Sequence, residues 1–315
     1  MRVHTSPVFN QIHTAADLAE KFSARESRTE IFHPSQPPVP FSSLVASVNM
    51  QNSDGSLLLE VQVCQDGVWS KFYQLGYFSA QENKSLSAQK DAIGRVAVDE
   101  LQLTRPAQQY RLRLTMTGDI SWREVHVCGV YAPFVYEEEK AALLPPGAYA
   151  FPVNPISQKE QPTPEKDRIC SPTSLCMALN TLGKKVTLSQ VMQGVYDSAS
   201  RIYGNWIFNT AYASRRGFDA YVRRFSALSE LAEFCTEKSL VIASVSYGEN
   251  ELPGSPQPQT PGHLILVRGY QDGQILTADP AARCAAEVLR AYDAKAFARA
   301  WLKNKQGAAY IVRKR

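Results

Sequence analysis

The sequence has few cysteines and no long apolar run. Its 315 residues contain six cysteines, without the close paired spacings of a zinc site or a redox motif, so neither a metal centre nor a disulfide framework is expected. No stretch approaches the roughly eighteen apolar residues of a membrane span, and the first twenty residues lack the apolar core of an export signal. We therefore expect no transmembrane segment. As written the chain would be cytoplasmic; a truncated N-terminus would instead fit an exported protein.

An excess of charge of one sign is also lacking. The 34 basic and 30 acidic residues are spread along the whole chain and leave a net charge of +4. So small and dispersed a charge does not indicate a nucleic-acid partner or an anionic membrane. The length and the 44% hydrophobic composition suffice for a sizeable core and favour two domains over one.

The first part of the chain predicts an all-β domain behind an N-terminal arm. Residues 1–40 combine one short helical pattern, "TAADLAEKF", with the proline-rich "HPSQPPVPF", and we interpret them as an arm and lead-in. From residue 41 to 132 the pattern has period two, as in "LLLEVQV" and "YRLRLTM". Asp66-Gly67 between two such runs indicates a hairpin. Residues 41–132 are therefore predicted to form an antiparallel β-sandwich.

A proline- and charge-rich linker, residues 133–150, precedes a segment with a different pattern. Residues 151–315 begin with three helical patterns, "SPTSLCMALNTLG", "TLSQVMQGVYD" and "SALSELAEFCTEK". The second of these opens with a capping-box pair, Thr187 and Gln190. Three apolar runs follow, "LVIASVSY", "HLILVRGY" and "QILTADP", which we interpret as strands. Helices followed by an antiparallel sheet make this half α+β.

A thiol at the start of a helix is the first chemical feature. Cys170 stands at the start of the helical pattern, where the positive end of the helix dipole and a protonated imidazole can lower the pKa of a thiol and make it a nucleophile. Cys176 lies within the same helix among apolar neighbours and is predicted to be a small buried hydrophobe. Spacing alone does not decide between a structural and a catalytic role for Cys170.

One histidine lies beyond the linker, His263, whereas the other four lie in the N-terminal part: His4, His13, His33 and His126. In "PGHLILVRGYQDGQILTADP", a three-residue turn "QDG" would oppose His263 to residue 281 and place Asp279 on the same face of the hairpin. A carboxylate there could hold the imidazole by one ring nitrogen while the other faces a thiol. The alternatives are a structural histidine at a strand start and a turn aspartate before Pro280.

Four blocks of the sequence together resemble a known family. They are "VNPISQ", "ICSPTSLCMAL", "YGNWIFNTAYASRRGF" and "GHLILVRGYQDGQILTADP". In their order and spacing they resemble the papain-like cysteine peptidases of the bacteriocin-processing type, in particular the broad bacterial group that is similar to them but stands apart from the exporters. The likeness covers about residues 151–312. It implies a papain-like peptidase domain with helices packed on an antiparallel sheet, preceded here by an all-β sandwich that resembles no family firmly.

The resemblance implies a role for each matching residue. Cys170 would be the nucleophile, His263 the base and Asp279 the group that orients it. Gln158 would help to form the oxyanion hole with the backbone N–H of Cys170, a stabilisation worth roughly 3 kcal/mol per donor. Gln161 is the alternative candidate for the oxyanion role given to Gln158.

The resemblance also implies a cleft and one departure from the family. "YGNWIFN" is similar to a block that lines the cleft, so Trp206 and Asn209 would contact substrate; the alternative is that Trp206 is simply core. The long proline-rich loop before His263 would border the cleft. Ser171 stands where the family often has glycine, and we interpret it as a tolerated variant.

The leading hypothesis is a cysteine peptidase that hydrolyses a peptide or related amide bond through an acyl-enzyme, with a peptide or protein as substrate and without metal or cofactor. Two alternatives stay open: transfer of the acyl group to an amine by the same residues, and a retired peptidase fold that acts as a binding module. For the sandwich, a surface or glycan ligand, substrate targeting and mere support are all open.

Overall fold

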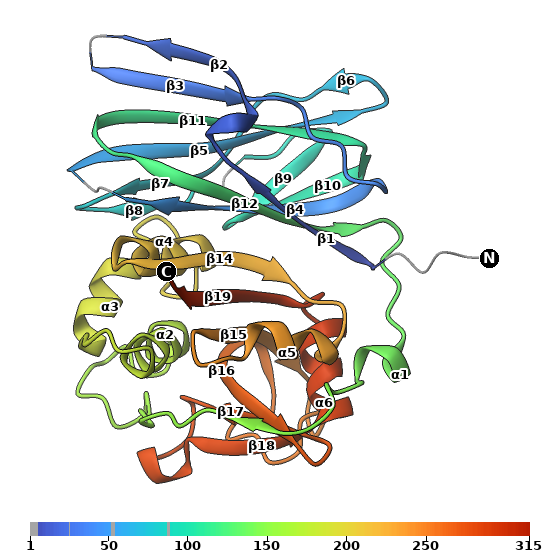
Figure 1. The fold of residues 1–315 in the computed structure, drawn as a ribbon, viewed down its shortest axis with the longest axis vertical. Helices are drawn as coiled ribbons and strands as arrows, with labels where there is room; N and C mark the ends of the chain where they lie inside the picture. The colour runs from blue at the N-terminus through green and yellow to red at the C-terminus, as the bar shows by residue number, and fades with distance from the viewer. Residues whose placement is uncertain (1–5, 25, 52–53, 87–88) are drawn as a thin grey trace.

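The computed structural model describes residues 6–24, 26–51, 54–86 and 89–315, so His4 lies outside the described residues. Two halves lie one above the other (Figure 1): an N-terminal β-sandwich and a C-terminal half in which helices pack on an antiparallel sheet. This is the α+β architecture with a preceding all-β domain that the sequence predicts. The boundaries chosen at residues 40, 132 and 150 stay predictions.

Two antiparallel sheets form the sandwich. The first has the order β1 (Val8–His13), β12 (Trp122–Tyr131), β4 (Phe41–Met50), β10 (Glu100–Ala107) and β9 (Gly94–Ala97). The second has the order β2 (Leu18–Ser23), β3 (Ser27–Phe32), β11 (Gln109–Asp119), β5 (Asp54–Gln65), β7 (Tyr73–Ser79) and β8 (Asn83–Lys84), with β6 (Val68–Trp69) against β5. The alternating apolar residues of β5 and β11, among them Leu59, Val61, Leu112 and Leu114, are fully buried between the sheets.

The hairpin predicted at Asp66-Gly67 is confirmed. Cys64 pairs with Trp69 and Gln65 with Val68, so Asp66 and Gly67 alone form the turn. Both have positive φ, 51° and 81°, as the tight turn that matches the twist of the strands requires.

The interpretation of residues 1–40 as an arm is wrong for most of its described part. Residues 8–32 form β1, β2 and β3, which are integral to the two sheets. The pattern "TAADLAEKF" yields only one 3₁₀ turn, Ala15–Asp17, closed by a capping box from Thr14. The chain then extends, because pairing with β3 supplies the backbone hydrogen bonds that a longer helix would have made.

The third sheet is the centre of the C-terminal half. Its order is β14 (Phe218–Arg224), β19 (Ala308–Lys314), β15 (Ser239–Tyr247), β16 (Thr260–Gln271), β17 (Gln274–Ala278) and β18 (Leu289–Asp293), and β13 (Tyr149–Ala150) pairs with β16. The helices are α1 (Glu138–Ala141), α2 (Cys170–Thr181), α3 (Leu188–Val195), α4 (Trp206–Arg215), α5 (Leu231–Phe234) and α6 (Ala294–Ala298), the last continued by a π turn at Arg299–Lys303. The predicted strands are confirmed, as are the first two helices, including the Thr187–Gln190 capping box.

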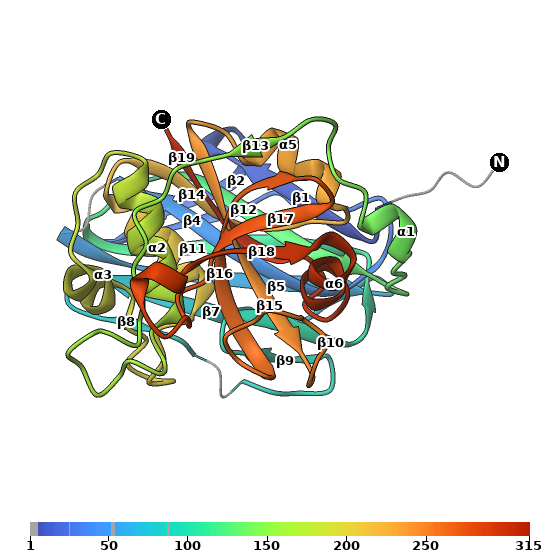
Figure 2. The same ribbon diagram turned by 90° about the horizontal axis from the view of Figure 1, so that it is seen from below.

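The third sheet is covered on both faces. Leu240 and Ile242 of β15 pack with α2, α3 and α4, whereas Val241 and Ala243 pack with α5, α6 and the π turn. Figure 2 shows α2 and α3 on one flank and α6 on the other. Burial of both faces explains why "LVIASVSY" is an apolar run rather than an alternation. The third predicted helix, "SALSELAEFCTEK", is shorter than expected: a 3₁₀ turn at Leu228–Glu230, then α5.

The two halves share a core and a hydrogen-bonded seam. Ile207, Phe208 and Ala211 of α4 and Val222 of β14 belong to the apolar cluster of the sandwich. Backbone N–H groups of the edge strand β14 donate to side-chain oxygens of the sandwich. The donors are Ala220, Val222 and Arg224, and the acceptors are Asn49 Oδ1, Ser47 Oγ and Asn10 Oδ1, at 3.0, 3.0 and 2.9 Å. The sandwich thereby satisfies an otherwise unpaired sheet edge.

Candidate active site

The start of α2 carries Cys170, where the sequence predicts the nucleophile. Cys170 is the first residue of this helix, near the positive end of its dipole, and it is partly exposed. Ser174, one turn further on and on the same face, donates from Oγ to the carbonyl oxygen of Leu264 at 3.0 Å. Because Leu264 follows His263 on β16, this contact holds Cys170 beside His263.

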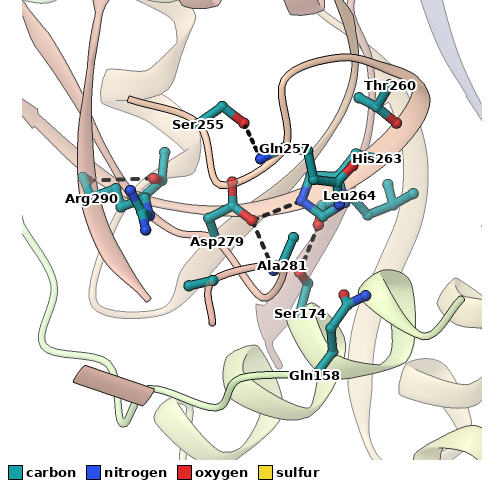
Figure 3. Close-up of polar contacts among 12 residues, drawn as sticks. Gln158, Ser174, Ser255, Gln257, Thr260, His263, Leu264, Asp279, Ala281 and Arg290 are labelled. Atoms are coloured by element: carbon teal, nitrogen blue, oxygen red, sulfur yellow. Dashed lines mark hydrogen bonds and ion pairs between the residues drawn. The ribbon is translucent and has the colours of Figure 1, made fainter. Parts of the chain in front are cut away.

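His263 and Asp279 meet as the sequence predicts, but through a different turn. His263 Nε2 lies 2.8 Å from Asp279 Oδ1, and both side chains are buried (Figure 3). The predicted three-residue turn is wrong: Gln271 pairs with Gln274 and the turn is Asp272-Gly273, both with positive φ. A bulge between Val267 and Gly269 shifts the register by one, so that the predicted alignment is restored next to His263.

The carboxylate of Asp279 is held by more than the imidazole. The backbone N–H of Ala281 donates to Oδ1 at 3.0 Å, and the hydroxyl of Tyr292 donates to Oδ2 at 2.7 Å. Tyr292 is buried in β18, which pairs with β17 immediately before Asp279. We did not predict a role for Tyr292, because β18 has no marked pattern in the sequence and its pairing brings the hydroxyl to the site.

The electrostatics of the three side chains are coupled. Burial alone would raise the pKa of the Cys170 thiol, but the hydrogen bond and charge of His263, with backbone hydrogen bonds at Leu264 and Ser171, hold it below its usual value. Burial would lower the pKa of His263, but Asp279 and Cys170 raise it to about 10. Burial would likewise raise the pKa of Asp279, and the charge of His263 with the hydrogen bonds it receives holds it low.

The other buried thiols behave differently. Burial raises the pKa of Cys128, Cys176 and Cys235 to about 12, 11 and 12. Cys176 is buried against Leu179 and Val191, as predicted for a small hydrophobe. All six cysteines, which lie among the described residues, are free thiols. The site therefore favours a thiolate at Cys170, in contrast to these three.

Gln158 is fixed next to the segment that carries Asp279. Its backbone N–H donates to the carbonyl oxygen of Pro280 at 2.9 Å, and its buried amide Nε2 donates to Lys166 O at 2.9 Å. One amide hydrogen of Nε2 is left, and Figure 3 shows the side chain pointing from its loop toward the part that carries Ser174 and His263. The amide of Gln161 instead donates to Ser157 O within its own loop. This arrangement favours Gln158 over Gln161 as the oxyanion donor.

Ser171 and Asn209 form a buried support under the nucleophile. Ser171 Oγ lies 2.9 Å from Asn209 Oδ1 and 2.7 Å from the hydroxyl of Tyr310. Asn209 Nδ2 donates to the carbonyl oxygens of Tyr203 and Asn205. The substrate contact predicted for Asn209 does not fit this structure, because the side chain is fully buried and each of its polar atoms has a protein partner.

Trp206, the first residue of α4, is half-buried and packs against two apolar clusters, so its predicted substrate contact stays a prediction. Two hollows lie at different places relative to the predicted site residues. One of about 540 Å³ adjoins Asp279 through Ala281. A more enclosed one of about 370 Å³ lies at the junction of the halves, where Tyr131 and Phe225 line it, away from the predicted site residues.

Within the part of the chain that the structure describes, no cluster of three or more His, Cys, Asp or Glu could hold a metal ion. No helix there is long and apolar enough to cross a membrane.

A helix-borne thiol beside an imidazole on an antiparallel sheet is the arrangement of a papain-like cysteine peptidase, and the comparisons agree with that class. Residues 151–309 match the model of the Peptidase_C39 like family, so the chain belongs to that family and is a cysteine peptidase-like hydrolase. Residues 26–130 match a second model, described as the Peptidase C39 N-terminal domain. The sandwich, which resembles no family firmly in the sequence analysis, thus matches a family model of its own. No curated protein matches the chain.

Solved structures similar to this chain align with about half of it. A C39-like peptidase candidate from Bacillus anthracis is 15% identical with a TM-score of 0.41, covering 54% of this chain and 98% of that one. The peptidase domain of Streptococcus ComA, a bi-functional ABC transporter, is 16% identical with a TM-score of 0.37, covering 52% and 99%. A double-glycine-motif protease in complex with a leader peptide is 19% identical with a TM-score of 0.36, covering 53% and 95%.

Proposed function

We propose that the protein hydrolyses a peptide or related amide bond through an acyl-enzyme on Cys170. The observation that carries the proposal is the buried contact of 2.8 Å between His263 Nε2 and Asp279 Oδ1, beside a thiol whose pKa is lowered. Because Nε2 is occupied by Asp279, Nδ1 is the ring nitrogen left to exchange a proton with Cys170.

The reaction then runs in two steps. The thiolate of Cys170 adds to the carbonyl carbon, and the oxyanion is stabilised by the Cys170 backbone N–H and the free amide hydrogen of Gln158. The C–N bond breaks as the imidazolium of His263 gives its proton to the leaving amine. His263 next takes a proton from water, whose oxygen attacks the thioester carbon. The C–S bond then breaks, the carboxylic acid leaves, and the thiolate of Cys170 and the imidazolium of His263 are restored. Asp279 keeps the imidazole oriented and stabilises its positive charge throughout.

A peptide library analysed by mass spectrometry tests this function. The parent chain is expected to produce new peptide termini, and Cys170→Ser is expected to reduce the rate by at least about 10³-fold, since the nucleophile is lost. Adding an amine such as glycinamide identifies the alternative, acyl transfer, because the products then gain the mass of the amine. No cleavage by the parent, or equal cleavage by Cys170→Ser, would contradict the proposal and favour a retired fold that serves as a binding module.

A further inference from the structure

The hollow beside Asp279 has a charged lining. Its residues are Lys159, Pro256, Ala281, Arg283, Glu287 and Arg290, with a volume of about 540 Å³. The hollow borders the proposed site on two sides. Lys159 directly follows Gln158, and the backbone N–H of Ala281 donates to Asp279 Oδ1 at 3.0 Å. A group bound in this hollow would therefore lie next to both the oxyanion donor and the residue that orients the imidazole.

Positive charge exceeds negative charge in this lining. Three side chains are cationic and one, Glu287, is anionic, so the lining carries a net charge of +2. Glu287 is shared between two of the cations: it is bonded to Arg283, and its Oε2 lies 3.8 Å from Arg290 Nη2. Lys159 is paired with Asp167, which is largely exposed. Arg290 is thus the cation with the weakest pairing to a carboxylate in the hollow.

Arg290 is also held in position. Its Nη1 donates to the carbonyl oxygen of Gly254 at 2.7 Å, which ties it to the long loop before His263. Its side chain is 23% exposed, and among the described residues its buried Nε has no hydrogen-bond partner. A guanidinium that is fixed through Nη1 and only weakly paired with Glu287 through Nη2 can bind a carboxylate in a defined geometry, at less entropic cost than a mobile lysine.

The position of the hollow assigns it to one side of the scissile bond. His263 must give its proton to the leaving amine, so the leaving segment of the substrate passes on the side of His263 and Asp279. The hollow adjoins Asp279, and Figure 3 shows Arg290 on the side of Asp279 away from His263. The residues just after the scissile bond are therefore the ones that can reach it.

We propose that this hollow is a subsite for a carboxylate on the leaving-group side of the scissile bond. Arg290 is the main partner of the carboxylate, and Arg283 and Lys159 supply further positive charge. The carboxylate is an acidic side chain or a free C-terminus of a short peptide. This proposal rests on the proposed function, because it assigns a substrate class to the same site.

Internally quenched peptides test the subsite. The best sequence from the peptide library is made with Glu or Gln at each of the first three positions after the scissile bond, and with a C-terminal acid or amide. The parent chain is expected to prefer Glu over Gln, or acid over amide, by about 10-fold or more in kcat/KM. A preference for Glu assigns the subsite to an acidic side chain, and a preference for the acid alone assigns it to a C-terminus.

Variants separate the subsite from the catalytic reaction. Arg290→Gln is expected to abolish the preference, so that the charged and the neutral peptide are cleaved with equal kcat/KM. Arg283→Gln, at a largely exposed position, is expected to weaken the preference by a smaller factor. Arg105→Gln, at an exposed position of strand β10 in the sandwich, is the charge-matched control and should change nothing.

Each outcome decides the question. Equal cleavage of charged and neutral peptides by the parent overturns the subsite and leaves the peptidase function standing. A preference that survives in both arginine variants also overturns it. If no peptide is cleaved and Cys170 reacts with iodoacetamide no faster than the other cysteines, the proposed function fails and the subsite with it.

Discussion

Tyr292 is the residue whose role is most open to a direct test. Its hydroxyl donates to Asp279 Oδ2 at 2.7 Å, and this bond is among the interactions that hold the pKa of Asp279 low. The remaining oxygen, Oδ1, is bonded to His263 and to the backbone N–H of Ala281. The buried carboxylate therefore has partners on both oxygens, as a charge in this environment requires.

Tyr292→Phe removes one donor and leaves Asp279 Oδ2 buried without it. We expect a loss of about 1–3 kcal/mol in the free energy of unfolding. The pKa of Asp279 should rise, because a bond to its charged form is lost. A carboxylate with a depressed pKa contributes stability above its unfolded pKa and loses it as the pH falls. Because ionised Asp279 stabilises the positive charge of His263, a higher pKa of Asp279 should also move the acid limb of the pH–rate profile to higher pH. A purely structural loss would not cause this shift.

Tyr149→Phe is the matched control for this variant. The Tyr149 hydroxyl is buried and has no hydrogen-bond partner among the described residues, so its removal should leave both stability and the pH profile unchanged. An unshifted acid limb in Tyr292→Phe, with normal melting, would contradict the role given to Tyr292. Melting curves and initial rates between pH 4 and 8 provide both readouts.

Ser171 shows how a departure from the family pattern is accommodated. The family often has glycine at this position, whereas here the hydroxyl bridges Asn209 Oδ1 and the Tyr310 hydroxyl inside the core. The side chain therefore points away from solvent into a site built for it. Its contacts link the first turn of α2 to α4 and to the central sheet.

At the scale of elements, α4 is capped from the other half of the molecule. Asp99 lies in the turn between β9 and β10, and its Oδ2 accepts from the backbone N–H groups of Trp206 at 2.7 Å and Ile207 at 3.4 Å. Val98, before it, has φ of 61°, an unfavourable conformation for a β-branched residue. The turn is thus strained where it inserts a carboxylate at the N-terminus of α4. Because α4 carries Asn209, this contact also supports Ser171.

Asp99→Asn should change how stability depends on pH. Burial raises the pKa of Asp99 to about 7, the charge of Glu100 adds to the rise, and the N–H groups of α4 oppose it. The folded chain thus holds this proton more strongly than the unfolded chain, so the contribution of Asp99 to stability is present in acid and lost as the pH rises through about 7. Asparagine keeps an acceptor oxygen but does not ionise.

Relative to the parent, Asp99→Asn should therefore gain roughly 2 kcal/mol in the free energy of unfolding between pH 5 and pH 8. Urea unfolding at the two pH values measures this gain. Asp66→Asn, in an exposed hairpin turn of the same domain, removes the same charge and should show no such gain. A difference for Asp99→Asn that stays constant with pH would show that the buried carboxylate does not titrate as described.

The hairpin of β16 and β17 shows what local patterns can and cannot predict. Alternation and the Asp-Gly turn located both strands and put Asp279 on the face of His263. The predicted turn length was wrong, and the bulge between Val267 and Gly269 compensated for it. The bulge contains a position that requires glycine: Gly269, with φ of 154°, lies against Tyr149 of β13, where an added Cβ would be 1.9 Å from the Tyr149 carbonyl oxygen. A pattern within one strand does not reveal such a contact.

At the scale of the whole molecule, the sandwich is part of the peptidase half rather than an appended module. It supplies acceptors for the edge strand β14, a cap for α4 and half of a buried ion pair between Glu100 and Arg224. The sequence predicted the two architectures. It also indicated Cys170, His263, Asp279 and Gln158 as site residues, and their roles stay a prediction. It did not predict the seam between the halves, because the participating side chains are far apart in sequence and none of them belongs to a local pattern.

The same limit explains why the interpretation of residues 1–40 as an arm is wrong for most of its described part. Residues 8–32 have no strong alternation, and several of them, including Glu20 and Lys21 of β2, are exposed. Their strands form because β12 and β11 already present edges to pair with. Tyr292 and Asp99 escaped prediction for this reason too: strand pairing and domain packing give each its role.

We propose that Cys170 is an activated thiolate paired with His263, and the proposed function depends on this pair. Alkylation by iodoacetamide as a function of pH, with the modified peptide identified by mass spectrometry, tests it most directly. The comparison is between the parent, His263→Ala and the control His33→Ala, an exposed histidine of the sandwich.

Fast labelling of Cys170 is expected in the parent and in His33→Ala well below the usual thiol pKa of about 8.5. At pH 6, His263→Ala should label at least about 10-fold more slowly. Labelling of Cys170 that is no faster than that of the half-buried Cys284, and that does not change in His263→Ala, would contradict the account.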